Sequence, residues 1–149
     1  FESVVDVVDR FIKIINPKRI YLGEKDMQQL KILEDYLKKK YKNISIVGCK
    51  TMREKNGLAI SSRNFLLSKK DKINASKIYN LININKYKII KNMISIKFIK
   101  DQIMKFGATK IDYVEVININ KIIKPFKKKI KFKIFIAYYM GAVRLIDNI

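Results

Sequence analysis

The sequence predicts an α/β protein: a partial, Rossmann-like parallel sheet followed by a small α+β part with an antiparallel sheet. Residues 1–50 alternate between helical and strand-like apolar patterns, as in parallel α/β units. Residues beyond Thr51 carry two helical patterns and then runs of period-two alternation, which is typical of antiparallel strands. Hydrophobic residues make up 48% of the 149 residues, enough to build a core.

The first part is predicted as helix, strand, helix, strand. The first helix covers residues 3–15, with Ser3 as its N-cap, and ends at Asn16-Pro17. Its apolar residues recur at helical spacing. They are Val4, Val5, Val8, Phe11, Ile12 and Ile15.

The next three predicted elements are a strand, a helix and a strand, and each strand ends at a glycine. A short strand over 19–22 ends at Gly23, and a buried strand over 44–47 ends at Gly48. Between them a helix is predicted over 26–41. Its inner face carries Leu30, Leu33 and Leu37. A parallel sheet of this topology needs more than two strands.

A boundary is predicted near Thr51, giving domains at 1–51 and 52–149. Residues 51–68 are polar and loop-like. Helices are predicted over 71–81, started by Ser68 or Asp71, and over 95–106. The intervening segment, 82–94, is rich in Asn, Ile and Lys and is left unassigned.

The last third of the chain predicts strands. Residues 111–117 form one strand, with Ile111, Tyr113 and Glu115 on one face. The second is a half-buried strand in which Ile130, Phe132, Ile134 and Ile136 alternate with Lys131 and Lys133. Residues 144–149 add a last short strand.

Two residue types restrict the chemistry. The chain has no histidine, which excludes a Ser-His triad and any His-based zinc site, and we predict no protein-bound metal site. The single cysteine, Cys49, excludes an internal disulfide and fits a reducing cytoplasm. It ends an apolar run, so we expect it to be a small buried residue rather than a nucleophile.

A net charge of +20 is typical of proteins that bind nucleic acid. However, the excess comes from 28 Lys against 5 Arg, alongside 28 Ile and 12 Asn. Nucleic-acid sites favour Arg, whereas Lys, Ile and Asn are the residues of A/T-rich codons. We interpret the charge as compositional drift on a solvated surface, and keep a basic nucleic-acid-binding module as the alternative.

The first polar motif, Gly23-Glu24-Lys25-Asp26, directly follows a predicted strand. Glycine allows close approach of a ligand, and the free N–H groups of the next helix favour an anion. Lys25 adds a mobile charge for phosphate, and Asp26 can cap the helix or help to hold Mg²⁺. Gln29 lies on the same helix face and suits a hydroxy acid. The alternative is an ordinary strand–turn–helix junction.

The second polar motif, Ser61-Ser62-Arg63-Asn64, follows Gly57. Two hydroxyls and a guanidinium on a loop can close over a triphosphate, where Arg63 stabilises charge on the leaving pyrophosphate. The alternative is an N-cap and a surface turn.

Together, and in this order, these blocks resemble the pantothenate synthetase family, which joins pantoate to β-alanine using ATP. The first block resembles its GEKD nucleotide signature, and the second its counterpart of the KMSKS loop of class I aminoacyl-tRNA synthetases. The similarity covers residues 1–148 and is strongest over 16–64. The blocks that carry it are 16–30, 46–48 with 51–54, 57–64, 111–116 and 144–148.

The resemblance implies adenylate chemistry, with ATP as co-substrate accompanied by Mg²⁺. Lys25 and Arg63 would stabilise charge on the phosphates, and Gln29 would hold pantoate. The implied ATP-binding residues are Gly23, Glu24, Lys25, Asp26, Met52, Ile60, Ser61, Ser62 and Arg63.

The family's HxGH-type motif, which supplies its catalytic histidine, has no counterpart in this chain. The chain opens at Phe1 without an initiator Met, and we expect a C-terminal fragment that is inactive alone. A decayed gene product is a further alternative, against which the intact motifs argue. The resemblance also implies a homodimer. From the single cysteine and the lysine-rich charge we expect a cytoplasmic protein with no specific nucleic-acid partner. No apolar run is long enough to span a membrane, so we expect no membrane association.

Overall fold

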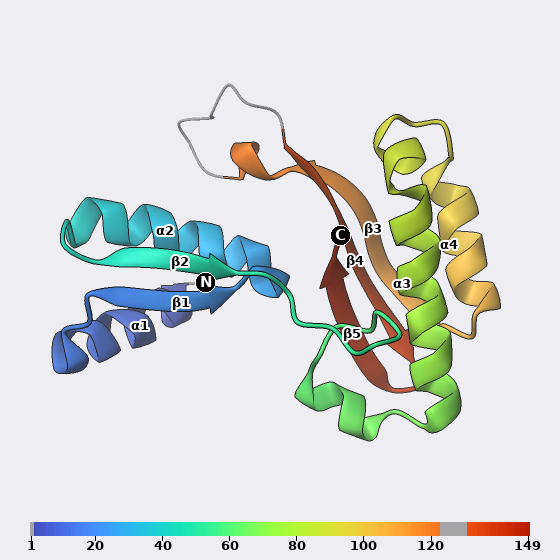
Figure 1. Ribbon diagram of the computed structural model, residues 1–149, viewed down its shortest axis with the longest axis horizontal. Helices are drawn as coiled ribbons and strands as arrows, with labels where there is room; N and C mark the ends of the chain where they lie inside the picture. The colour runs from blue at the N-terminus through green and yellow to red at the C-terminus, as the bar shows by residue number, and fades with distance from the viewer. Residues whose placement is uncertain (1, 123–130) are drawn as a thin grey trace. The chain divides into compact units, whose positions relative to one another are not determined.

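The structure is a computed structural model that describes residues 2–122 and 131–149 (Figure 1). These residues form two compact units, one of residues 2–51 with 121–122, the other of Met52–Asn120 with 131–149. The architecture is mixed α/β, as predicted, with a small parallel sheet in the first unit and a three-stranded antiparallel sheet in the second. The assignment of residues 1–51 and 52–149 as domains stays a prediction.

The first unit is a parallel strand pair with two helices. Its elements are α1 (Glu2–Ile15), β1 (Arg19–Gly23), α2 (Met27–Lys40) and β2 (Ser45–Cys49), each close to its predicted position. β1 pairs with β2 in parallel, with Ile20 opposite Ile46. The predicted leucines of α2 are buried, because they recur on one helix face.

One expectation for α1 was wrong. The helix begins at Glu2, so Ser3 lies inside the helix and is not its N-cap. Ile12 is buried, but Phe11 is 57% exposed and Ile15 is 66% exposed. The described parallel sheet has only two strands, which offer too little surface to cover the whole apolar face of a 14-residue helix.

Cys49 is exposed, which corrects the expectation of a buried residue. Side chains alternate across a strand, so Cys49 lies on the same face of β2 as Val47. Tyr21, opposite Val47 in the register, is 62% exposed. Cys49 therefore belongs to the solvent-exposed face of the strand pair.

A single carboxylate links the two helices of this unit. Asp9 of α1 accepts hydrogen bonds from the hydroxyls of Tyr36 (2.6 Å) and Tyr41 (2.7 Å). Lys13 and Lys40 each place an ammonium 2.9 Å from it. The hydrogen bonds from Lys13 and the two tyrosines lower the pKa of Asp9 below its usual range.

The second unit packs two helices on one face of the antiparallel sheet (Figure 1). Its helices are α3 (Lys69–Ile90) and α4 (Ile96–Lys105). Its strands are β3 (Lys110–Asn118), β4 (Phe132–Met140) and β5 (Val143–Asn148), in the order β3-β4-β5. The core between helices and sheet includes Ile78, Ile82, Ile99, Ile103, Ile134 and Ile136.

The first helix of this unit is longer than predicted. Ser68 is its N-cap, since its hydroxyl accepts from the backbone N–H of Asp71 at 3.1 Å. The helix continues through most of the unassigned segment 82–94, with Ile82 and Ile89 fully buried. The predicted end at residue 81 was wrong, because interspersed asparagines, which are poor helix formers, hid the helical pattern.

Two predictions about the strands also need correction. A register shift between Ile111 and Tyr113 places Ile111 against the core with Val114, so Ile111 and Tyr113 do not share a face. β4 is the central strand and is buried on both faces from Ile134 to Tyr138, not half-buried. Ile130 lies outside the described residues.

Across residues 2–122 and 131–149, no helix is both long enough and apolar enough to cross a lipid bilayer.

Candidate functional site

The first polar motif lies at the carboxyl end of β1. Gly23 is the last residue of the strand, and Glu24–Asp26 form a 3-10 turn that leads directly into α2. In parallel α/β sheets, ligands bind at the carboxyl ends of the strands. The motif therefore occupies the position in this unit where that topology places a ligand.

Gly23 is surrounded by open space. Its φ of −67° and ψ of 133° are ordinary for any residue. A Cβ added there would have no heavy atom within 4 Å. The described fold therefore does not require glycine at this position, whereas close approach of an external group to the backbone would.

The side chains that follow differ in exposure. Glu24 and Lys25 are half-buried, and Asp26 is exposed. Asp26 is the N-cap residue of α2, but its side chain makes no capping hydrogen bond, so capping does not explain this residue. Gln29 is half-buried in the first turn of α2. The junction between β1 and α2 thus carries the four predicted ATP-binding residues of this motif and Gln29, the predicted pantoate-binding residue.

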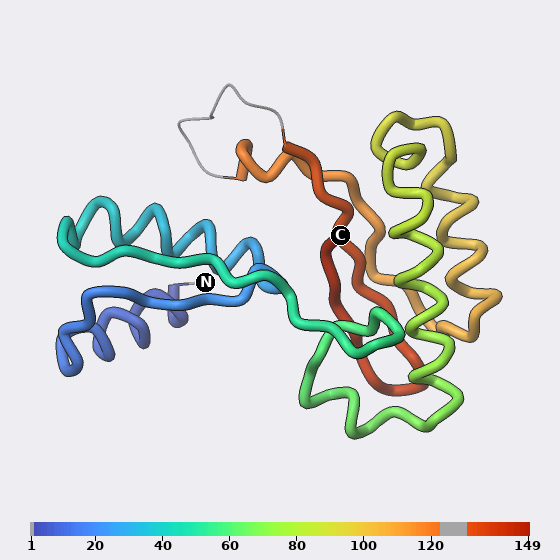
Figure 2. The backbone as a smooth tube through the Cα atoms, in the orientation of Figure 1, coloured from blue at the N-terminus to red at the C-terminus, as the bar shows by residue number. Residues whose placement is uncertain are grey.

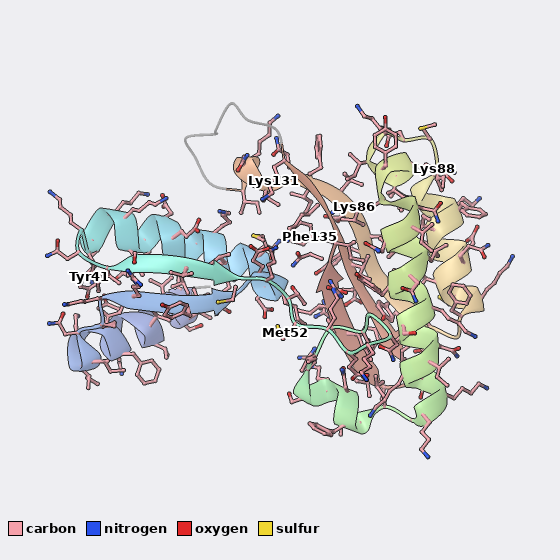
Figure 3. The ribbon with its side chains drawn as sticks, viewed as in Figure 1. Tyr41, Met52, Lys86, Lys88, Lys131 and Phe135 are labelled. Carbon is pink, nitrogen blue, oxygen red and sulfur yellow. The ribbon has the colours of Figure 1, made fainter. Side chains whose placement is uncertain are left out.

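The second set of predicted residues starts with a hairpin, visible in Figure 2 as a reversal of the chain beside β5. Arg53 and Ala59 pair in an antiparallel bridge, and the N–H of Ile60 donates to the carbonyl of Met52 at 3.0 Å. Met52, labelled in Figure 3, is 72% exposed, and Ile60 is 55% exposed. The hairpin thus brings two predicted ATP-binding residues, eight positions apart, into direct contact.

Asn56 and Gly57 form the turn of this hairpin. The Oδ1 of Asn56 accepts from the N–H of Leu58 at 3.0 Å, and the N–H of Gly57 donates to the carbonyl of Glu54 at 2.8 Å. Gly57 has a φ of +93°, which other residues rarely adopt. The Asn-Gly dipeptide is a strong hairpin signal that the sequence analysis did not use.

The Ser-Ser-Arg-Asn motif directly follows the hairpin. Ser61 caps a 3-10 turn over Ser62–Leu66, since its hydroxyl accepts from the N–H of Arg63 at 3.3 Å. Ser62 and Arg63 are exposed. Ser61 is therefore an N-cap, as the alternative interpretation predicted. The side chains of Ser62 and Arg63 remain at the surface.

The guanidinium of Arg63 is held against β5. Its Nη1 donates to the backbone carbonyl of Arg144 at 2.9 Å. The side chain of Arg144 pairs with Asp112 at 2.7 Å, which lowers the pKa of Asp112. This contact uses one of the five N–H donors of the Arg63 guanidinium.

Asn64 is the buried member of the motif, only 6% exposed. Its amide donates to the carbonyl of Ala59 at 3.0 Å and to Glu54 at 3.3 Å. Within the described residues its Oδ1 has no hydrogen-bond partner. Asn64 therefore ties the turn after the hairpin back onto both strands of the hairpin.

The two sets of predicted residues belong to different units. No group of three or more His, Cys, Asp or Glu side chains suited to a metal ion occurs among residues 2–122 and 131–149. The arrangement offers charge and hydrogen bonds for an anionic ligand, and the described residues show no nucleophile–base pair. Sequence reasoning missed Arg53 and Asp147, which lie 94 positions apart and pair through their side chains.

Comparison with known proteins gives one family. The sequence profile described as pantoate-β-alanine ligase matches residues 1–149. The pantothenate synthetase of Caldicellulosiruptor bescii is 38% identical over all of this chain and 54% of its own length. That of Clostridioides difficile is 34% identical over 99% of this chain and 54% of its own length. The chain thus spans about half the length of the relatives that it matches.

Solved structures agree with this result. The pantoate-β-alanine ligase of Francisella tularensis, complexed with β-γ ATP and β-alanine, superposes with a TM-score of 0.77 and 32% identity. The match covers 98% of this chain and 48% of that one. The pantothenate synthetase of Thermus thermophilus gives a TM-score of 0.81 at 26% identity, over 100% of this chain and 55% of that one. The chain therefore belongs to the pantoate-β-alanine ligase family.

Proposed function

We propose that this chain supplies nucleotide and pantoate contacts for the ATP-dependent condensation of pantoate with β-alanine. The observation that carries the proposal is the Gly23–Asp26 junction at the carboxyl end of β1, in a chain matched by the family along its whole length. ATP, pantoate and β-alanine are the proposed substrates.

The proposed reaction has two balanced steps. A carboxylate oxygen of pantoate attacks the α-phosphorus of ATP, which forms pantoyl adenylate and releases pyrophosphate. The amine of β-alanine then attacks the acyl carbon and loses a proton to solvent, and AMP leaves with the electron pair of the broken C–O bond. Catalysis of such steps rests mainly on positioning and on charge stabilisation.

The first unit would hold the phosphates and pantoate. Lys25 places an ammonium beside the polyphosphate, and the bare backbone of Gly23 lets the nucleotide approach closely. Glu24 and Asp26 flank this contact. The amide of Gln29 both donates and accepts, which suits the hydroxyl and carboxylate groups of pantoate.

The second unit would hold the adenine and close over the phosphates. The N–H of Ile60 already donates to the carbonyl of Met52, so this N–H is occupied, whereas the carbonyl keeps a second lone pair. Ser61 and Ser62 offer hydroxyls. The remaining N–H groups of Arg63 reach the phosphates, where they stabilise the charge on leaving pyrophosphate.

Mg²⁺ would arrive bound to ATP. It holds most of its waters in nucleotide sites and binds through phosphates and one or two carboxylates. The exposed carboxylate of Asp26 fits that need, and no larger acidic group occurs in the described chain. The ion supplies charge neutralisation on the polyphosphate.

The adenylate step has its own assay. Because that step is reversible, the full-length natural protein should exchange labelled pyrophosphate into ATP when pantoate is present and β-alanine is absent. Lys25→Ala should slow this exchange by about 100-fold or more, since one charge-stabilising group is lost. Lys39→Ala, at the exposed far end of α2, should leave the exchange rate unchanged. Exchange that does not need pantoate, or that Lys25→Ala leaves intact, contradicts the proposal.

Two expectations from the family resemblance remain proposals. One is that residues 1–149 alone do not catalyse the condensation, because they contain no histidine. The same exchange assay on residues 1–149 tests it, and exchange there would contradict it. The other is a homodimer of the full-length enzyme, which sedimentation at several concentrations tests.

A further inference from the structure

We propose that Arg53 is a positioning residue, which fixes the hairpin of residues 52–60 so that its backbone is preorganised for the nucleotide. The inference rests on the proposed function for what the hairpin binds. Its structural part rests only on contacts within the second unit.

One guanidinium joins the hairpin to β5. Nη1 of Arg53 donates to Asp147 at 2.6 Å and Nη2 donates to the other carboxylate oxygen at 2.9 Å, a two-pronged pair. Nη1 also donates to the carbonyl of Gly57 in the hairpin turn, at 3.1 Å. A longer contact of 3.4 Å reaches the carbonyl of Asn148. The Asp147 side chain is only 9% exposed, so this pair is largely shielded from water.

The ring of Tyr79, on α3, packs against the Arg53 guanidinium. The Arg53 guanidinium lies 4.1 Å from the centre of this ring. Gly57 rests against the same ring so closely that an added Cβ would overlap its edge. Turn, guanidinium and ring are therefore stacked as one packed group between α3 and β5.

This group acts on the predicted nucleotide residues through the backbone. Arg53 lies between Met52 and Glu54. The carbonyl of Met52 accepts from the N–H of Ile60, and the N–H of Glu54 donates to the carbonyl of Leu58. A fixed Arg53 side chain therefore fixes the strand that carries Met52, and through it the partner strand that ends at Ile60. The Asn64 amide secures the following turn from the other side.

Lysine cannot replace this side chain. An ammonium is a point charge, whereas the planar guanidinium matches both carboxylate oxygens, reaches the Gly57 carbonyl and stacks on an aromatic ring. Arg53→Lys conserves the charge and should leave the unit folded, but it loosens the hairpin.

Hydrogen exchange tests the structural part without any substrate. In Arg53→Lys and in Asp147→Asn, the amides of Glu54, Gly57 and Ile60 should exchange about tenfold faster or more, while those of α3 and α4 stay protected. Asp112→Asn is the matched control, since it breaks the other Arg–Asp pair of this sheet, which does not contact the hairpin. Unchanged exchange in the hairpin, or equal loss of protection throughout the unit, overturns the inference.

Steady-state kinetics on the full-length natural protein test the functional part. Arg53→Lys should raise KM for ATP by about 10- to 100-fold while KM for pantoate stays within a factor of about two, since only the nucleotide site is displaced. Asp112→Asn should change neither constant. Equal changes in both KM values, or no change despite faster hairpin exchange, overturn the positioning role. A wild-type protein that ATP does not saturate overturns the proposed function instead, and the exchange result then decides the structural part alone.

Discussion

Gly57 is the residue whose local conformation most strongly restricts substitution. Its φ of +93° disfavours any side chain, and the Tyr79 ring occupies the space of a Cβ. Gly57→Ala should therefore lower the free energy of unfolding of the second unit by about 2–4 kcal/mol, from strain plus overlap. Chemical denaturation followed by circular dichroism measures this loss.

Gly141 provides the matched control for that substitution. It also has a positive φ, of +57°, but nothing lies within 4 Å of an added Cβ. Gly141→Ala should therefore cost only about 1 kcal/mol. Equal losses for the two variants would show that the Tyr79 contact contributes nothing.

Asp9 should make the stability of the first unit depend on pH. Its folded pKa is lowered, chiefly by hydrogen bonds from Lys13, Tyr36 and Tyr41, so its ionised form stabilises the folded state. That contribution is complete above the unfolded pKa of about 3.9 and is lost as the pH falls below it. Hydrogen exchange of the α1 and α2 amides between pH 6 and pH 3 should show protection falling with pH.

Asp9→Asn should lower protection at neutral pH and flatten this dependence. Asp35→Asn removes a carboxylate that pairs only with the exposed Lys39 and should preserve the slope. A wild-type profile that stays flat down to pH 3, or an unchanged slope in Asp9→Asn, would show that this carboxylate does not stabilise the unit.

At the scale of elements, the N-terminus of α3 depends on one hydroxyl. Ser68 accepts from the N–H of Asp71 and donates to its carboxylate at 2.7 Å. Ser68→Ala should cost about 1 kcal/mol of unfolding free energy, and Ser68→Thr should restore most of it. Thermal unfolding of the three proteins measures the effect; a loss that threonine does not restore would exclude capping as its cause.

Elements with local signals were predictable from the sequence, and elements set by distant contacts were not. The α2 leucines and the Ser68 cap act within one or two turns, and the sequence shows both. The burial of β4 on both faces depends on its central place between β3 and β5. The alternation of Phe132 and Ile134 with lysines describes only its first residues, so it predicted a half-buried strand.

The residues of the candidate site likewise divide into those with a local sequence signal and those whose contacts are distant in the sequence. The motif residues from Gly23 to Gln29 and from Ser61 to Arg63 were found from residue type, order and resemblance. The Asn56-Gly57 turn had a local signal that was not used. The pairing of Arg53 with Asp147 had none, because it joins positions 94 apart and appears only after the chain has folded.

For the whole molecule, the charge of +20 predicts weak binding to any polyanion. Of the lysines labelled in Figure 3, Lys86 and Lys88 lie on α3, whereas Lys131 lies directly before β4. We expect duplex DNA to bind without sequence preference and to dissociate as salt rises to about 0.2 M. Fluorescence anisotropy with two unrelated duplexes at several salt concentrations measures this. Tight binding to one duplex at that salt would favour the nucleic-acid-binding alternative.

We propose that the polar motifs of the two units serve one condensation. The most direct test is AMP release by the full-length natural protein with ATP, Mg²⁺, pantoate and β-alanine, comparing wild type with Lys25→Ala and Arg63→Ala. We expect one AMP per pantothenate, formed only when all substrates are present, and a loss of activity of about 100-fold or more in each variant. AMP release that does not need pantoate, or that survives both substitutions, would contradict it.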